Sequence, residues 1–540
     1  MGERAAQAPR QALGKVIERL SIIAPRVCEH PAVSMRVLLW HGWLLDGTGS
    51  NVYTARVAEV LVEDGHDVVV LCQERHAERH PWVGAVGTVS VAGVSDLGPA
   101  SAGTGSGRGV ILRPDIGRLL PVFVLDEYEG FDAKRFVDLT DDELGWYLDA
   151  NVRALLAAVE WQSPDVVIVG HAVPGGVIGG RALGPGKYVV KIHGSDVEYA
   201  MRPQRRYREL AREGLEAAIA VTGSSQDVLD RCAELVPGIE RRSRVVHPGV
   251  DAIRFSPRPR RAALLDVAAR LDLDASTARG RTPSIDVKAE DATRSRNLTS
   301  LDALANDYDQ TVPDPTAADA LRVLARSDVS TVGYLGKLIP QKGVALLLAA
   351  LTRTSTTPPA LIIGFGTERE RLQALVRALR AGDDATVGWL LVSADWNIPS
   401  ADLGPLPLRS EVTFTGRLDH SYAPDALAAV DVLVVPSVLD EAFGMVAAEG
   451  AAAGALPLVA RHSGLAEVAG ALEGYVGRPG LFSFEPRPVT VGRIGEGIDR
   501  LLMLEPSDRA SLRDAVREFV TREWSWRRTA VGLIDAAVTR

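Results

Sequence analysis

The sequence predicts an α/β protein of two domains, in which buried parallel strands alternate with helices. Short runs rich in valine, isoleucine and leucine recur in both halves of the chain, and each is followed by glycine or polar residues and then by a helix-prone stretch. A chain of 540 residues with 46% hydrophobic content is too long for one domain and supports two. No apolar stretch reaches the roughly 18 residues that a membrane-spanning helix needs.

The amino-terminal half opens with a strand, a helix and a second strand. The expected elements are a strand over residues 36–41, a glycine-rich loop over 47–51, a helix over 52–63 and a strand over 67–72. A dinucleotide fingerprint would have its third glycine where Val52 stands, so NAD binding is weakly supported, although Glu74 lies near the acidic position of that pattern. The pattern predicts a βαβ unit and leaves its ligand open.

Three strands in the carboxyl-terminal half are each followed by residues suited to hold a ligand. Residues 332–343 run from a strand into a helix and carry Lys337 and Lys342 on the loop between them. Two lysines in such a loop can clamp a diphosphate, although an isolated pair with this spacing is usually surface charge. Residues 361–366 and 412–417 are further strands that end at glycine, where backbone can approach a ligand closely.

A pair of glutamates flanks the next turn from strand to helix. Residues 431–436 form a short β-branched strand, and the alanine-rich residues 445–453 favour a helix. Glu441 therefore lies in the loop, and Glu449 lies about two turns into the helix. Ligands of open α/β sheets bind at this end of the strands, where the free N–H groups of a helix attract an anion. Taken alone, the pair is more often a solvated loop glutamate and a helix-face glutamate.

Each group at this turn suits one part of a nucleotide sugar, which carries both hydroxyls and phosphates. Glu449 can accept hydrogen bonds from ribose hydroxyls, and Glu441 can accept them from the sugar ring. The backbone amides of Phe443, Gly444 and Met445 can hold the diphosphate. The turn is therefore a candidate donor site.

Taken together and in this order, these segments resemble the retaining glycosyltransferases of family 4, which have the GT-B fold of two Rossmann-like domains facing a central cleft. The family motifs are a G-R-L-x-x-x-K-G loop, a G-x-G strand end, an F-x-G strand end and an E-x-F-G-x-x-x-x-E segment. Here they correspond to Gly336-Lys337-Leu338 with Lys342-Gly343, Gly364 with Gly366, Phe414 with Gly416, and Glu441 through Glu449. Lys337 stands where the family generally has arginine, so positive charge is kept and bidentate phosphate recognition is lost.

The amino-terminal half carries weaker motifs of the same family. Gly47 and Gly49 occupy the loop that in the family approaches the donor phosphate and the acceptor. His193 lies in residues 191–196, which resemble the family's H-G segment facing the donor sugar, although a single histidine at a strand end is as often a structural hydrogen bonder. Residues 245–251 resemble the N-G-V-D segment that closes this domain.

The resemblance implies a glycosyltransferase, and specifically transfer of a hexose from a UDP-, GDP- or ADP-sugar with retention of configuration and without a metal or a cofactor. The acceptor, whether a glycan, a lipid or a small molecule, stays open. The resemblance assigns catalytic roles to Lys342, Glu441 and His193. Its substrate-binding residues are Gly47, Gly49, Lys337, Gly364, Gly366, Arg417, Phe443, Gly444, Met445 and Glu449.

The resemblance also divides the chain into segments. They are a disordered N-terminal extension (1–34), an N-terminal Rossmann-like acceptor domain (35–257), an interdomain insert of low order (258–329), a C-terminal Rossmann-like nucleotide-sugar domain (330–515) and a helix crossing back to the first domain (516–540). The insert is expected to have low order because its alanine-, arginine- and aspartate-rich pieces show no apolar period long enough for a core. Residues 84–110, rich in glycine, serine and alanine, are expected to form a flexible surface loop.

Composition and charge limit the partners. A net charge of −9 argues against general nucleic-acid affinity. Three scattered cysteines indicate neither disulfides nor a metal site, and with no signal-peptide core they favour a cytoplasmic location. Two acidic triplets in the insert, Asp272 with Asp274 and Asp307 with Asp309, are expected to be solvated charges.

One basic segment, residues 202–212, admits two interpretations. Its arginines can contact a phosphorylated acceptor or anionic lipid headgroups at the inner face of a membrane. Because glutamates are interleaved with the arginines, a solvated helix face is the favoured interpretation.

Three other functions remain open from the sequence. A glycosidase also uses two carboxylates, but it needs them on either side of one bond and leaves the lysine pair unexplained. A nucleotide-sugar epimerase of similar two-domain build would explain the phosphate site but not the glutamate pair. A sugar-nucleotide-binding protein without catalysis is kept open by Lys337 in place of arginine.

Overall fold

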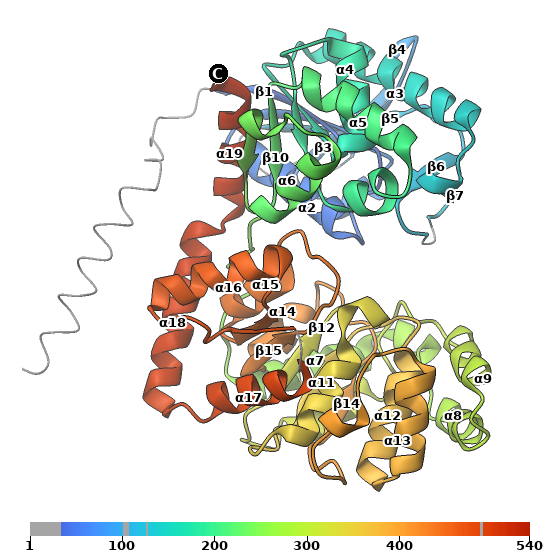
Figure 1. Cartoon of the computed structure of the whole chain (residues 1–540). Helices are drawn as coiled ribbons and strands as arrows, with labels where there is room; N and C mark the ends of the chain where they lie inside the picture. Colours follow the sequence, from blue (N-terminus) through green and yellow to red (C-terminus); the bar gives the residue numbers. More distant parts are fainter. Residues whose placement is uncertain (1–33, 101–106, 126–127, 487–489, 540) are drawn as a thin grey trace, which may run out of the picture.

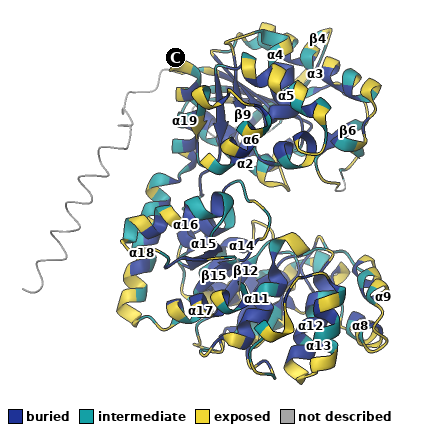
Figure 2. Ribbon diagram, viewed as in Figure 1, coloured by how far each residue is buried: buried dark blue, intermediate teal, exposed yellow. Residues whose placement is uncertain are grey.

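The computed structural model describes residues 34–100, 107–125, 128–486 and 490–539. The chain forms two α/β domains, one above the other in Figure 1, and the last helices run beside both. Figure 2 shows buried strands at the centre of each domain and exposed residues on the outer sides of the helices. The predicted α/β class with two Rossmann-like domains is confirmed. The predicted N-terminal extension lies outside the described residues, apart from Ser34.

The N-terminal domain is built on a nine-stranded sheet of order β11-β10-β9-β8-β1-β2-β5-β3-β4. Its strands are β1 (Arg36–Trp40), β2 (Asp67–Leu71), β3 (Val83–Ser90), β4 (Gly93–Pro99), β5 (Arg108–Pro114), β8 (Val166–Gly170), β9 (Val189–Lys191), β10 (Ala220–Gly223) and β11 (Ser243–Val245). All neighbouring strands are parallel except β3 and β4. Two short strands, β6 (Leu119–Val122) and β7 (Asp132–Arg135), pair separately.

The predicted βαβ unit is present as β1, α2 (Gly49–Glu63) and β2, with Arg36 opposite Asp67. Helix α2 begins at Gly49 rather than at residue 52, because Thr48 at the N-cap position is still extended. The other principal helices of this domain are α3 (Asp141–Gln162), α4 (Val177–Leu183), α5 (Arg205–Ala217) and α6 (Gln226–Leu235). They cover the sheet so that one hydrophobic core lies on each of its faces.

The predicted surface loop over residues 84–110 is wrong for the described part of that segment. Strands β3, β4 and the start of β5 occupy it, and Val89 and Val110 are buried in the core. Some of the glycines that suggested a loop, such as Gly87 and Gly109, lie where neighbouring backbone approaches closely. A Cβ on Gly87 would lie 3.0 Å from the carbonyl oxygen of Ser95 on the neighbouring strand.

The C-terminal domain has a fully parallel six-stranded sheet of order β14-β13-β12-β15-β16-β17. Its strands are β12 (Val332–Leu335), β13 (Ala360–Ile363), β14 (Val412–Phe414), β15 (Val432–Val435), β16 (Leu456–Ala460) and β17 (Ser483–Phe484). Its principal helices are α11 (Val344–Ala350), α12 (Arg369–Ala381), α13 (Asp384–Ser393), α14 (Ala423–Ala428), α15 (Met445–Ala453), α16 (Ser463–Val476), α17 (Thr490–Leu502) and α18 (Pro506–Glu523).

The prediction of low order for residues 258–329 is wrong. This insert forms α7 (Arg260–Leu273), α8 (Ser284–Arg294), α9 (Leu298–Ala303) and α10 (Ala317–Leu324), and it contributes to the core of the C-terminal domain. Each helix supplies only a few apolar residues, but α7 and α10 pack on each other and bury them jointly. Two buried ion pairs fasten the insert to α12, Arg281 with Glu370 and Asp314 with Arg369.

The chain passes between the domains twice, and the two passages lie side by side. Val250, on the outward passage, forms a parallel β-bridge with Ser525 on the return. Helix α19 (Trp526–Val538) then packs on α2, β8 and β10 of the N-terminal domain and buries Ala530 and Leu533 there. In Figure 1 this last helix stands beside the first domain.

The described helices are all too short or too polar to cross a lipid bilayer. The basic run lies mainly on α5, where its arginines pair with nearby carboxylates, such as Arg205 with Glu209 and Arg206 with Asp141. These pairs match the solvated helix face that the interleaved glutamates favour.

Candidate active site

Lys342 and Glu441 meet at the carboxyl ends of the two central strands of the C-terminal sheet. Lys342 follows β12 and Glu441 follows β15, and because these strands are parallel neighbours their loops lie together. The Lys342 ammonium donates to Glu441 Oε1 in a half-buried ion pair. Ser437 Oγ donates to the same oxygen at 2.8 Å, and the Glu441 amide donates to Ser463 Oγ at 3.0 Å. The arrangement holds the Lys342 ammonium and the Glu441 carboxylate side by side at the carboxyl edge of the sheet.

Lys337 and Arg417 flank the ring of Phe365 on the adjacent loops. The Lys337 Nζ lies 5.9 Å from the ring centroid, and the Arg417 guanidinium carbon lies 5.2 Å from it. Both cations therefore stand at the carboxyl ends of β12, β13 and β14, where a diphosphate could be neutralised.

Gly364 and Gly366 lie on either side of Phe365, and neighbouring backbone fills the space at each. A Cβ on Gly364 would collide with the Gly336 carbonyl oxygen, and one on Gly366 would lie 2.5 Å from the Leu338 carbonyl oxygen. The backbone that closely approaches these glycines is therefore the loop at Gly336 and Leu338 and not a ligand. This packing shapes the edge of the site.

The loop from Phe443 to Met445 leads into α15. Gly444 has φ +99°, and a side chain there would collide with Leu465, so this turn requires glycine. The Phe443 ring is buried and packs on His247 and Trp524, at centroid distances of 5.3 and 5.0 Å. Its side chain is therefore structural, and only the amides of this loop are available to a ligand.

Glu449 lies on the second turn of α15 and is buried. Its carboxyl group faces Arg56 of α2, which belongs to the other domain. Burial raises the pKa of Glu449 to about 7, and the positive charge of Arg56 opposes that shift without cancelling it. A buried carboxyl group without a partner within hydrogen-bond distance among the described residues is suited to accept hydrogen bonds from a ligand.

The buried carboxyl of Glu449 gives a pH-dependent stability. Because the folded-state pKa of about 7 exceeds the ordinary value of 4.5, the unfolded chain loses this proton first as the pH rises. The free energy of unfolding therefore falls between those two pH values and is level above them. Urea denaturation at about pH 5 and about pH 8 should show a smaller fall for Glu449→Gln than for the parent. The exposed Glu411→Gln serves as control, and an unchanged fall in Glu449→Gln would refute the assignment.

His193 belongs to a cluster of three histidines at the carboxyl ends of β1, β8 and β9. Its ring lies 4.5 Å from that of His171, and the rings of His171 and His41 are 6.3 Å apart. Burial, together with the neighbouring histidines, lowers the pKa of His193 and His171 well below the usual range. These two imidazoles are therefore neutral at physiological pH and offer hydrogen bonds rather than positive charge.

Two ionisable residues, Asp196 and Lys191, lie buried beside the histidines. Asp196 accepts hydrogen bonds from the amides of Ala172 and Gly194, at 2.6 and 2.9 Å, and so ties the two loops together. Burial raises the pKa of Asp196 to about 6 and lowers that of Lys191 to about 7. Lys191 Nζ donates to Ser224 Oγ at 2.8 Å.

The candidate residues of the two domains face one another. A Cβ on Gly194 would lie 3.4 Å from the Ala442 side chain, which places the histidine loop directly against the loop that carries Glu441. The Glu467 carboxylate of α16 accepts the amides of Gln226 and Asp227 at the start of α6, at 3.0 and 2.8 Å. These contacts agree with the expected GT-B architecture, in which the site lies between the two domains.

Gly47 and Gly49 lie at the exposed start of α2. Gly47 has φ +96°, and no atom lies within 4 Å of a Cβ built on either residue, so a ligand could approach this loop. The loop is held by Asn51, whose Nδ2 donates to the Asp46 carbonyl oxygen at 2.6 Å and whose Oδ1 accepts from His41 Nε2 at 2.9 Å.

A metal site has weak support among the described residues. Asp46, Glu74 and His80 have potential ligand atoms within 4.8 Å of one another. Both Glu74 oxygens, however, already accept backbone amides, from Leu45 at 2.9 Å and His76 at 2.8 Å. Glu74 therefore shapes the loop before α2.

The acidic triplets of the insert are engaged in the fold. Asp272 pairs with Arg322, and Asp307 pairs with Lys288 at 2.6 Å. Asp274 and Asp309 each accept the amide two residues ahead in the chain. They are ion pairs and caps rather than free charges. The expectation that both triplets lie away from the strand ends is wrong for the second one, because Gln310, next to Asp309, accepts the amide of Gly366 after β13 at 3.0 Å and Pro313 bridges Gly416 after β14.

Sequence reasoning gave no role to several residues that the structure places at this junction. They are His41, Arg56, His171, Lys191 and Asp196. The available signal was a charged or imidazole side chain at the end of a buried strand, as in β8 and β9. His171 is the clearest case, since both its ring nitrogens are buried without a partner among the described residues and its φ is +71°.

Two family models match the chain. Residues 48–249 match the glycosyl transferase 4-like domain, and residues 329–480 match the domain called glycosyl transferases group 1. The two matches cover the domains that carry the two sides of the candidate site. A search of curated proteins found no match to the sequence.

Solved structures share the two-domain fold at low sequence identity. Sucrose-phosphate synthase from Thermosynechococcus elongatus aligns with a TM-score of 0.52 and 17% identity, over 93% of this chain and 98% of that chain. Anabaena HepE, solved with UDP, gives 0.52 and 12%, over 93% and 99%. The catalytic domain of Arabidopsis thaliana starch synthase IV, bound to ADP and acarbose, gives 0.55 and 12%, over 94% and 99%.

Proposed function

This chain is a family 4 glycosyltransferase with the GT-B fold, and we propose that it transfers a hexose from a nucleoside-diphosphate sugar with retention of configuration. The observation that carries this proposal is the pairing of Lys342 with Glu441 beside the start of α15, directly opposite the histidine loop of the N-terminal domain. The site thus offers a cation for the diphosphate and a carboxylate for the sugar on two adjacent loops.

The chemistry requires stabilisation of the diphosphate as it leaves. Lys342, Lys337 and Arg417 supply positive charge, and the amides of Gly444 and Met445 at the start of α15 supply hydrogen-bond donors. When Lys342 turns to the diphosphate, Glu441 is released to accept hydrogen bonds from hydroxyls of the sugar. Glu449 accepts hydrogen bonds from the ribose.

Retention of configuration follows from attack on the same face that the diphosphate leaves. The acceptor hydroxyl forms the new bond to the anomeric carbon as the bond to the phosphate oxygen breaks, and the departing phosphate takes the acceptor proton. No protein nucleophile is needed in this scheme. His193, neutral and placed at the domain junction, orients the sugar by hydrogen bonding.

A nucleotide as part of the donor is supported by two structural neighbours, one solved with UDP and one with ADP. The test is a thermal-shift screen of UDP-, GDP- and ADP-sugars. A donor at 100 times its Kd should stabilise the fold by about 2.7 kcal/mol. Hydrolysis or transfer products of the donor that binds then give the anomeric configuration by NMR. If no nucleotide sugar raises the melting temperature, the proposal fails.

Metal removal should leave the activity intact. Because lysines, arginine and backbone amides are proposed to neutralise the diphosphate, turnover with the donor identified above should continue in excess EDTA. The measurement is the initial rate before and after chelation and after adding back Mg²⁺ or Mn²⁺. A rate abolished by EDTA and restored by either ion would show that a metal neutralises the leaving group.

A further inference from the structure

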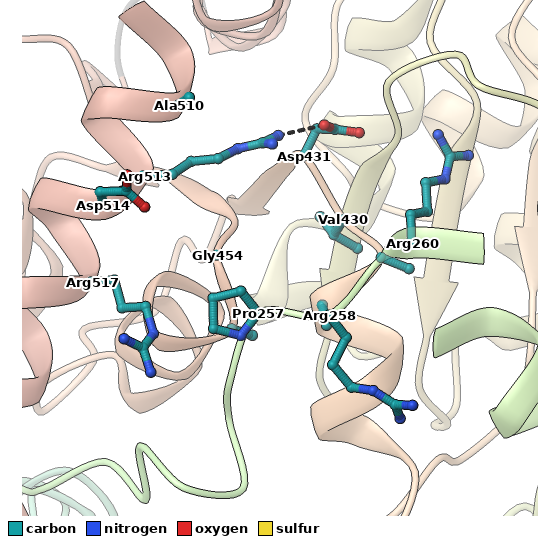
Figure 3. A pocket seen from close by; sticks show the side chains of 13 residues that line it. Pro257, Arg258, Arg260, Val430, Asp431, Gly454, Ala510, Arg513, Asp514 and Arg517 are labelled. Carbon is teal, nitrogen blue, oxygen red and sulfur yellow. Dashed lines mark hydrogen bonds and ion pairs between the residues drawn. The ribbon is translucent and has the colours of Figure 1, made fainter. Parts of the chain in front are cut away.

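A pocket lined by charged residues lies on the C-terminal domain, at the edge of its sheet opposite to the candidate active site. It has a volume of about 260 Å³ and is bounded by the insert, by the start of β15 and by α18 (Figure 3). Asp431, at its wall, directly precedes β15, whereas Glu441 follows the other end of that strand. The pocket is therefore separate from the candidate active site.

Arginines dominate the lining of this pocket. Four arginines, Arg258, Arg260, Arg513 and Arg517, line it together with two carboxylates, Asp431 and Asp514. Each arginine is drawn in Figure 3 on the segments that enclose the pocket. The excess of positive charge favours an anionic ligand.

The arginines are unequally satisfied. Arg513 is paired with Asp431, and Arg258 is paired with Asp266 and Asp425. Arg260 and Arg517 have no carboxylate partner within the part of the chain that the structure describes, and bond only to backbone carbonyls.

Two guanidinium nitrogens at the pocket are unsatisfied. The Nε atoms of Arg260 and Arg513 are buried and have no hydrogen-bond partner among the described residues. A buried charged donor without an acceptor is costly, so either side chain would gain free energy by turning its Nε–H toward an oxyanion in the pocket.

We propose that this pocket binds the phosphate group of a small phosphorylated molecule or free phosphate. Guanidinium groups match the tetrahedral oxygens of phosphate with paired N–H donors. The volume lies just below the usual range for drug-sized ligands, so it suits a phosphate with a body no larger than one sugar.

The pocket lies near the two chain segments that connect the domains. Arg258 and Arg260 lie just after the passage from the N-terminal domain, and Arg517 lies on the helix that precedes the return passage. A phosphate held between these arginines joins the two chain segments that connect the domains. The site therefore lies close to both of the segments that connect the domains.

The test is calorimetric titration of the full chain with inorganic phosphate and, separately, with glucose 6-phosphate, at constant ionic strength. Arg517→Gln removes a pocket charge that pairs with no carboxylate, and Arg522→Gln removes an exposed charge from the same helix, outside the pocket. We expect Arg517→Gln to weaken binding about tenfold or more and Arg522→Gln to leave it unchanged. Tighter binding of glucose 6-phosphate identifies a phosphate ester as ligand, and equal binding identifies free phosphate.

Two further variants keep the result decisive. Ala510→Glu places a negative charge at an exposed position of the lining, where folding should tolerate it, and should weaken binding as Arg517→Gln does. Lys342→Ala alters the candidate active site and should leave this binding intact. No binding to the parent, or loss of binding in Lys342→Ala with retention in Arg517→Gln and Ala510→Glu, would overturn the proposal. None of these outcomes depends on whether a sugar is transferred.

Discussion

Replacing Lys342 by alanine is expected to lower kcat by on the order of 10²-fold or more. The proposed role of the ammonium group is to stabilise charge that grows as the diphosphate departs, so its loss should affect the transition state more than donor binding. Glu449→Gln should behave differently, because its hydrogen bonds to the ribose form in both the ground and the transition state. Its effect should appear mainly in KM for the donor. Steady-state kinetics with the donor found by the thermal-shift screen measures both.

Lys288→Ala provides the control for this experiment, since Lys288 is an exposed lysine on the insert that pairs with Asp307. Its kinetics should match those of the parent. Loss of the Lys342 pairing also leaves Glu441 without its cation, so the melting temperature of Lys342→Ala must be measured alongside. A well-folded Lys342→Ala with near-normal kcat/KM for every accepted donor would place the donor site elsewhere.

Glu370→Gln is expected to lower the free energy of unfolding by about 3–5 kcal/mol. Arg281 and Glu370 are 4% and 0% exposed, and the two nitrogens of Arg281 donate to Glu370 at 2.8 Å each. Neutralising the glutamate leaves a buried guanidinium without its main counter-charge, although the partly exposed Asp286 still pairs with it. Urea denaturation of the full chain measures the loss.

Asp291→Asn is the matched control for Glu370→Gln, because it makes the same carboxylate-to-amide change in the insert. Asp291 and its partner Arg294 are 68% and 76% exposed, so the change should cost no more than about 1 kcal/mol. Similar small losses in both variants would mean that the insert contributes little to the stability of the C-terminal domain.

The fold could be predicted because its information is local in the sequence. Strands such as β12, β13 and β15 are short, largely apolar runs that end at glycine or a turn, and a parallel sheet brings all their carboxyl ends to one edge. Lys342 and Glu441 could be placed on that edge from the sequence because each of them follows one of these strands. Their direct contact followed from β12 and β15 being neighbours in the sheet.

The insert and the histidine cluster could not be predicted in the same way, because both depend on contacts between distant segments. The apolar residues of α7 make a core only when α10, some fifty residues later, packs on them. His171 gains its environment from Trp43, Phe123 and His193, which come from three other loops. No periodicity within one segment records such an assembly.

The position of α19 affects the order in which the protein can mature during synthesis. This helix is translated after the whole second domain, yet it covers apolar residues of the first domain, with Ala530, Leu533 and Ala536 all nearly inaccessible. The apolar surface of the first domain under α19 therefore stays exposed until the whole second domain has been translated. A nascent chain arrested before residue 526 should consequently be a preferred client of chaperones that bind exposed apolar surface.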